Sequence, residues 1–184
     1  MKKISFIILC ILFISSGCKA QSQSSLNQIK TAKCKLQGFT SPFSIEATNV
    51  YNDLNGQIIM TLYADSIEGA GHIITIIASK KEWLKLDCES ISEGTFAWIK
   101  GGKVGTATRN YNNEVIPLYQ EPDKKSKVVS ELHGQQIVLI YGGSGHWAYI
   151  KGKGKDGKEV EGWLEPEMQC PNPYTTCPTP VYSN

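Results

Sequence analysis

Short runs of β-branched and aliphatic residues, separated by polar turn clusters, make up most of the chain after residue 45. The clearest runs are residues 73–77, 83–86, 137–141 and 147–150, with Gly, Asn, Asp and Lys clusters between them. Runs of this length and composition are typical of β-strands. No stretch beyond the N-terminal apolar run keeps the 3.6-residue period of an amphipathic helix. The pattern therefore predicts an all-β protein.

The runs recur along the chain. Three aromatic landmarks return in the same order, in pairs 68, 64 and 65 residues apart: Tyr51 and Tyr119, Trp83 and Trp147, Trp98 and Trp163. A unit of roughly 65 residues made of short strands favours closure into a small β-barrel of about five strands, which removes exposed strand edges. We therefore expect two small barrels in tandem, at residues 45–108 and 109–170.

The second unit also carries a series of short motifs in a fixed order: LYQEP at 118–122, SKVVSEL at 126–132, QIVL at 136–139, GHWAYI at 145–150 and EGWL at 161–164. This series resembles the bacterial SH3 (SH3b) domain family, and the resemblance extends over residues 45–175. The first unit departs from it, because DLNG at 53–56 replaces a Pro-containing turn and Ala97 replaces the Gly before the last Trp. The resemblance implies SH3-like barrels with grooves that hold extended peptides or peptidoglycan stems.

Strand alternation separates the tryptophans from the aliphatic side chains. In the run 83–86, Trp83 and Lys85 share one face and the two leucines share the other. The other three tryptophans are out of phase with their aliphatic neighbours in the same way. One interpretation is an exposed aromatic surface that binds a ligand; the other is cross-strand packing, or burial between the two units. The candidate ligand-binding residues are Tyr51, Trp83, Trp98, Tyr119, Trp147, Tyr149 and Trp163.

The first twenty residues have the pattern of a secretory signal peptide. Lys2 and Lys3 precede an apolar run at residues 4–14, shorter than the ~20 residues that a membrane span needs. Ser-Ser-Gly-Cys at 15–18 resembles a bacterial lipobox, which would make Cys18 a lipidated first residue; cleavage after Ala20 is the alternative. We expect an exported protein, either a lipoprotein that faces the periplasm or cell surface or a soluble periplasmic or secreted form. Residues 21–44 would follow as a tether and N-terminal segment.

Four cysteines remain besides Cys18 after removal of the signal: Cys34, Cys88, Cys170 and Cys177. In an oxidising compartment they predict two disulfides, with three possible connectivities. We favour Cys170–Cys177, which would close a short Pro-rich loop at the start of a Pro/Cys-rich tail at 171–184, and Cys34–Cys88, which would pin the N-terminal segment to the first unit. The chain has no C-x-x-C motif and its three His show no ligand spacing, so we predict no metal and no cofactor.

Charge and motifs narrow the classes of function. The net charge of +2 becomes zero once Lys2 and Lys3 are removed, so nothing favours nucleic-acid binding. Residues 152–157 match G-x-G-x-x-G but lie between two strand runs, which predicts a hairpin loop. Ser144 and His146 lack the spacing of a nucleophile elbow. Four acidic residues at 159–167 follow closely on four lysines at 151–158, which predicts a solvated charge mosaic and not a metal site. Asp65, Glu68 and His72 occupy a longer loop of the first unit.

These observations favour a non-catalytic protein of the cell envelope that recognises peptidoglycan or an extended peptide, and that meets the membrane only through a lipid anchor. The alternative is an inhibitor or immunity protein that acts on a partner enzyme or toxin, since small secreted β proteins without catalytic residues suit that role as well. A structural accessory of an envelope assembly is a third possibility. Two modules and a tether fill the chain, which argues against an enzyme.

Overall fold

The computed structural model describes residues 31–40, 47–63, 71–88, 96–171 and 177. The predicted signal peptide, the candidate lipidation residue Cys18 and the loop residues Asp65 and Glu68 lie outside the described residues. Within the described ranges, no helix is long and apolar enough to cross a membrane.

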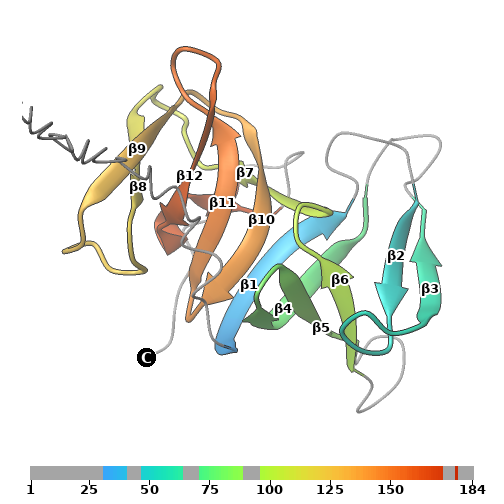
Figure 1. The fold of residues 1–184 in the computed structure, drawn as a ribbon. Coiled ribbons are helices and arrows are strands. Elements are labelled where there is room, and N and C mark those ends of the chain that lie inside the picture. Colours follow the sequence, from blue (N-terminus) through green and yellow to red (C-terminus); the bar gives the residue numbers. More distant parts are fainter. Residues whose placement is uncertain (1–30, 41–46, 64–70, 89–95, 172–176, 178–184) are drawn as a thin grey trace, which may run out of the picture.

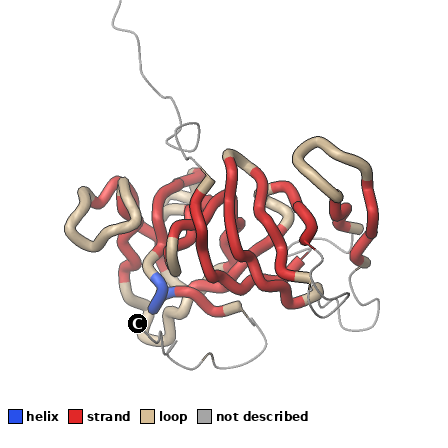
Figure 2. The backbone as a smooth tube through the Cα atoms, turned by 90° about the horizontal axis from the view of Figure 1, so that it is seen from below, coloured by secondary structure: helices blue, strands red, loops and turns tan. Residues whose placement is uncertain are grey.

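The described residues form thirteen strands in one antiparallel sheet, which confirms the all-β prediction. The other element is a short 3-10 turn, η2 (Pro166–Met168) (Figure 2). The strands are β1 (Ala32–Thr40), β2 (Thr48–Tyr51), β3 (Ile58–Leu62), β4 (Ile73–Lys80), β5 (Trp83–Asp87), β6 (Phe96–Lys100), β7 (Val104–Thr108), β8 (Val115–Tyr119), β9 (Val128–His133), β10 (Ile137–Ser144), β11 (Trp147–Lys153), β12 (Glu159–Leu164) and β13 (Gln169–Cys170). Residues 32–40, which the sequence assigned to the segment ahead of the first unit, thus form a strand of the sheet.

The pairing of the strands repeats along the chain. In the first strand set, β1–β6, β4 pairs with β1 and β5, and β6 pairs with β5 and β2, which pairs with β3. The second strand set, β7–β12, repeats each of these pairings in the same order. The sheet order is β3-β2-β6-β5-β4-β1-β7-β10-β11-β12-β8-β9 (Figure 1). β1 of the first set pairs with β7 of the second in the middle of this order, which joins the two sets into one sheet.

Irregularities of the backbone repeat as well. The β4–β5 ladder shifts register between Ile76 and Ala78, and the β10–β11 ladder shifts between Ile140 and Gly142. The β2–β3 and β8–β9 hairpins each shift register just before the tyrosine of their first strand. Such bulges bend a strand and increase its twist. The internal repeat of the sequence therefore extends to the local geometry of the chain.

The core includes the side chains that alternate with the tryptophans. The four strands that carry the tryptophans, β5, β6, β11 and β12, contribute seven buried side chains to the main hydrophobic core cluster: Leu84, Leu86, Ala97, Ile99, Ala148, Ile150 and Leu164. None of the four tryptophans belongs to this cluster. The period-two pattern of the sequence predicted this division correctly, because successive side chains of a strand point to opposite faces.

The two strand sets meet where β1 crosses β7. A Cβ atom built at Gly38 would lie 2.6 Å from Val104 Cγ1 and 2.7 Å from the Gly105 carbonyl oxygen, so the close crossing requires glycine. Nearby, the Gly102 N–H donates a hydrogen bond of 2.8 Å to the Ile140 carbonyl. In Figure 1, β1 and β10 accordingly run through the middle of the molecule, between the β2–β3 and β8–β9 hairpins.

One of the two favoured disulfides is present. Cys170 and Cys177 are bonded, with Cα atoms 5.5 Å apart. Cys34 and Cys88 are both buried free thiols, so the Cys34–Cys88 bridge was wrong. Cys34 lies on β1 and Cys88 follows β5, and β4 separates these strands in the sheet. Two strand spacings amount to roughly 10 Å, beyond the reach of a disulfide.

Candidate functional site

The first aromatic cluster consists of Tyr51, Trp83 and Trp98, from three strands of the first set. Tyr51 pairs with Trp98 across the β2–β6 ladder. Its ring meets that of Trp83 edge to face, with centroids 5.2 Å apart and planes at 90°. Trp83 is buried, whereas Tyr51 and Trp98 remain half-buried.

The second aromatic cluster consists of Tyr119, Trp147, Tyr149 and Trp163. Tyr119 pairs with Trp163 across the β8–β12 ladder and meets Trp147 edge to face at 5.5 Å and 89°. Tyr149 pairs with Trp163 on the other side, and their ring centroids are 5.4 Å apart. Tyr149 and Trp163 are buried, and Tyr119 and Trp147 are half-buried.

All seven candidate residues therefore lie in two equivalent clusters on the face opposite the aliphatic core. Edge-to-face pairs of this kind stabilise a fold by about 0.5–1.5 kcal/mol beyond the area that they bury. The buried members, Trp83, Tyr149 and Trp163, support the clusters from within. The surface that a ligand can reach consists of the half-buried members: Tyr51, Trp98, Tyr119 and Trp147.

Two lysines extend the first aromatic cluster. Lys100 pairs with Trp83 across the β5–β6 ladder, and its Nζ lies 5.5 Å from the Trp83 ring centroid. Lys85 pairs with Trp98, and its Nζ lies 4.1 Å from the Phe96 ring centroid. In the part of the chain that the structure describes, neither lysine forms an ion pair with a carboxylate. The sequence placed Lys85 on the tryptophan face; the same alternation, continued two residues beyond Trp98, would have found Lys100.

The second aromatic cluster has the opposite charge at the equivalent place. Glu165 follows Trp163 by two residues, as Lys100 follows Trp98, and it is buried. Lys124 Nζ lies 2.6 Å from Glu165 Oε2 and 3.4 Å from Glu167 Oε2. The hydrogen bond to Glu165 raises the pKa of Lys124 above its usual value. This ion pair joins the β8–β9 loop to η2 beside the cluster.

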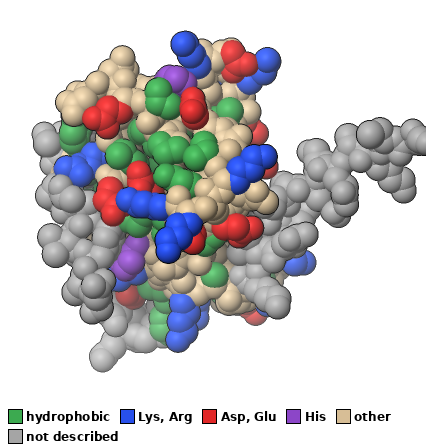
Figure 3. All heavy atoms as spheres, turned by 90° about the vertical axis from the view of Figure 1, so that its left-hand side faces the viewer, with side chains coloured by type: hydrophobic (Ala, Val, Ile, Leu, Met, Phe, Trp, Pro, Cys, Tyr) green, Lys and Arg blue, Asp and Glu red, His purple; other side chains and the backbone are tan. Residues whose placement is uncertain are grey.

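The surface of the second set carries a charge mosaic, as predicted. Figure 3, which views the side where β8 and β9 lie, shows hydrophobic side chains surrounded by acidic and basic ones. Lys151 Nζ lies 3.1 Å from Glu159 and 3.5 Å from Glu161. Burial has the largest single effect on the pKa of Lys151 and lowers it, but hydrogen bonding to Glu159 and the charges of Glu159 and Glu161 together raise it above its usual value. Among the described residues, no three His, Cys, Asp or Glu side chains gather as a metal site.

Two segments whose sequences resemble catalytic motifs form turns in the structure. Residues 154–158 close the β11–β12 hairpin, with Gly157 N–H donating to the Gly154 carbonyl at 3.0 Å, as the position of the G-x-G-x-x-G match predicted. Ser144 pairs with Trp147 across a two-residue turn that contains His146. The His146 Nδ1 lies 3.2 Å from the Lys35 carbonyl on β1, which orients the imidazole toward the first strand set.

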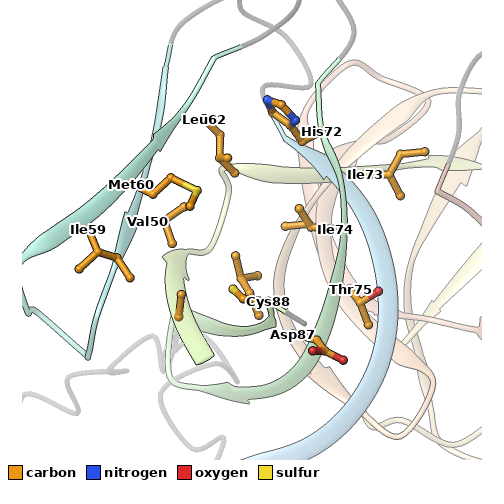
Figure 4. A pocket seen from close by; sticks show the side chains of 12 residues that line it. Val50, Ile59, Met60, Leu62, His72, Ile73, Ile74, Thr75, Asp87 and Cys88 are labelled. Carbon is orange, nitrogen blue, oxygen red and sulfur yellow. The ribbon is translucent and has the colours of Figure 1, made fainter. Parts of the chain in front are cut away.

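The structure adds a cleft that the sequence did not predict (Figure 4). It has a volume of about 380 Å³ and lies between β3 and the β4–β5–β6 part of the sheet. Its lining is mostly aliphatic and includes Val50, Met60, Leu62, Ile74 and Leu86. The Cys88 thiol also faces it; burial, followed by the charge of Asp87, raises the pKa of this thiol. His72 and Asp87 contribute polar groups to the lining.

Comparison with known proteins yields only distant likenesses. No protein-family model matches the chain, and no curated protein matches its sequence. Among solved structures, NlpC1 from Trichomonas vaginalis is 12% identical, with a TM-score of 0.30 over 73% of this chain and 45% of its own. NlpC2 from the same organism is 13% identical, with a TM-score of 0.29 over 72% of this chain and 46% of its own. The chain spans less than half the length of either protein, and the bacterial SH3 resemblance stays a prediction.

Proposed function

We propose that the protein is a non-catalytic binding protein of the cell envelope that recognises peptidoglycan or an extended peptide through its two aromatic clusters. One observation carries the proposal: the Tyr–Trp edge-to-face pair occurs twice, at equivalent positions of the two strand sets, at 5.2 and 5.5 Å. Each pair leaves a half-buried tyrosine at the surface. A rigid aromatic surface of this kind binds extended ligands at a low entropic cost.

Each strand set, in this proposal, acts as one SH3-like unit. The repeated strand pairing and the repeated bulges support an equivalence of the two units. Two sites that are weak on their own would gain affinity when both reach the same polymer, because the second contact is intramolecular. Export, and anchoring through a lipid on Cys18, belong to the same proposal and rest on the signal-like N-terminus.

The charges around the clusters favour a division of roles. Lys85 and Lys100 present ammonium groups beside the first aromatic cluster, where a ligand carboxylate or phosphate would find cations that no described carboxylate neutralises. In the second cluster, the Lys124–Glu165 ion pair already balances the charge. We therefore assign the anionic group of the ligand to the first cluster and its uncharged, extended part to the second.

A pulldown on purified sacculi tests this proposal. The wild-type protein should be retained, and retention should fall in Tyr51→Ala and Trp147→Ala variants, which remove half-buried cluster members. Tyr63→Ala is the matched control, since Tyr63 is 67% exposed and lies outside both clusters. Lys85→Gln plus Lys100→Gln should weaken retention most at low salt, because exposed charges are screened as ionic strength rises. Wild-type protein that stays in the supernatant, or cluster variants retained as well as Tyr63→Ala, would refute the proposal.

A further inference from the structure

In the second strand set, β9 closes over the sheet at the place where β3 borders the cleft. A cleft of about 410 Å³ lies on the second set, and five of its lining residues stand 64 residues after lining residues of the first cleft, but no residue of β9 lines it. Leu132 of β9 is fully buried, and β9 packs against both β11 and β12. Two glycines allow this approach. A Cβ built at Gly152 would lie 3.0 Å from Leu132 Cδ2, and one built at Gly162 would lie 3.2 Å from Val129 Cγ2.

In the first strand set, side chains replace both glycines. Cys88 stands 64 residues before Gly152, and Ala97 stands 65 residues before Gly162, as the tryptophan pairs do. Both side chains line the cleft. Leu62, the equivalent of Leu132, is only half-buried. β3 of the first set therefore covers the sheet less closely than β9 of the second, and two positions that are glycine in the second set carry side chains in the first.

Among the described residues, no strand pairs with the outer edge of β3, the strand that borders the cleft. β3 ends the sheet order and packs mainly on β2. It contains no charged residue, and Ile58 and Ile59 are 54% and 50% exposed. β9, the other end of the order, carries Glu131 and His133. Exposed apolar edges invite pairing with another strand, and charged side chains are a common protection against it.

We infer that β3 and the cleft form a docking site for an extended, aliphatic peptide segment of a partner protein. The backbone of the peptide would pair with the free edge of β3, and alternate side chains would enter the cleft. An acyl chain would use the aliphatic lining but not the edge, whereas a peptide uses both. The volume lies at the lower end of the ~300–1,000 Å³ typical of ligand sites and suits a few aliphatic side chains. None of the seven aromatic cluster residues lines this site, which goes beyond the function proposed for them.

The test uses the full secreted chain and a capped peptide with alternating residues, acetyl-Thr-Val-Thr-Val-Thr-Val-Lys amide. Binding is measured by calorimetry and by the shift of the methyl signals of Leu62, which lines the cleft, in NMR spectra. Ile59→Lys places a charge on the half-exposed edge beside the cleft and should weaken binding by about tenfold. Val129→Lys is the matched control, because Val129 is the equivalent residue of β9 and is 46% exposed. It should leave binding within about twofold of the wild type, because β9 borders no such cleft.

The variants separate this site from the aromatic clusters, so its failure and that of the proposed function are distinguishable. Peptide binding that is lost in Ile59→Lys and kept in Val129→Lys and Trp147→Ala supports the site. Three results would overturn it: no binding of the peptide, binding of decanoate instead of the peptide, or a dimer of the wild type in sedimentation that Ile59→Lys abolishes. The second result indicates an acyl site, and the third indicates a second copy of this chain on β3.

Discussion

Ser79 and Gly143 occupy equivalent positions of the two strand sets, 64 residues apart, and hydrogen-bond to each other twice. The Ser79 hydroxyl donates to the Gly143 carbonyl at 2.8 Å and accepts from the Gly143 N–H at 3.0 Å. Both groups are buried. The two copies of the repeat thus contact each other through the same position, on β4 of one and β10 of the other. This contact favours a fixed orientation of the two copies relative to each other.

Replacing Ser79 by Ala should destabilise the protein by about 1–3 kcal/mol. The change leaves the buried N–H of Gly143 without its hydroxyl acceptor, and an unsatisfied buried donor costs about that much. Urea unfolding followed by tryptophan fluorescence measures the effect. Ser130→Ala, which removes a partly buried hydroxyl that donates to the Glu161 carbonyl within the second set, should cost less. Equal losses in the two variants would argue against a special role of the contact between sets.

The two tryptophans that begin β5 and β11 should respond differently to truncation. Trp83 is 5% exposed, so Trp83→Ala removes a buried indole and should cost about 3–5 kcal/mol of folding free energy. Trp147 is half-buried, so Trp147→Ala should cost distinctly less and mainly affect ligand retention. Thermal unfolding of both variants, measured beside the sacculus pulldown, separates the two effects. A larger stability loss in Trp147→Ala would contradict the burial of the clusters.

Gly152→Cys should open the second strand set toward the arrangement of the first. A Cβ at this position would lie 2.8 Å from Val138 Cγ1 and 3.0 Å from Leu132 Cδ2, so the side chains of Val138 on β10 and Leu132 on β9 must shift. Overpacking of this kind typically costs about 1–3 kcal/mol. Gly157→Ala is a control for loss of a glycine where a Cβ would contact nothing, although its φ of +76° adds a local backbone cost. Proton NMR should show the Leu132 methyl groups shifting in Gly152→Cys and not in Gly157→Ala.

The Lys124–Glu165 ion pair should contribute stability below alkaline pH. The pKa of Lys124 is raised in the folded protein, chiefly by its hydrogen bond to Glu165. Its contribution is therefore complete below the unfolded pKa of about 10.4 and declines as pH rises through the higher folded value. Because the Lys124 side chain is 55% exposed, Lys124→Met should cost only about 1 kcal/mol at pH 7. Urea unfolding should show a smaller difference in unfolding free energy between the wild type and Lys124→Met at pH 11 than at pH 7. Lys125→Met should have the stability of the wild type at both pH values.

The disulfide at the C-terminal side should stabilise the pairing of β13 with β7. Cys170 pairs with Ala107 of β7, and Cys177 packs in the same small buried cluster. For a sequence separation of seven, the loss of loop entropy predicts about 2–3 kcal/mol. The double variant Cys170→Ser, Cys177→Ser should lose this amount in urea unfolding and no longer respond to reductant. Sensitivity to reductant that persists in the variant would point to a second bridge.

The alternation of side chains made much of the structure predictable. It placed Leu84 and Ile150 in the core and the tryptophans on the other face, because successive strand residues point in opposite directions. The repeat predicted that Tyr51 and Tyr119 would have equivalent surroundings, and each meets its tryptophan edge to face. It did not predict that β1 and β7 would join both sets into one sheet, since strand order depends on contacts between residues far apart in the sequence.

The sequence by itself determined the strand content, the duplication and the residues of the aromatic clusters, because these depend on local periodicity and on recurrence along the chain. Only the tertiary structure decided which cluster members are buried and why Cys34 and Cys88 stay apart, with β4 between their strands. It also decided that the first copy is open and the second closed. Cys88 and Ala97 stand where the second copy has two glycines, and a side chain can hold off a neighbouring strand only where the fold brings that strand within contact.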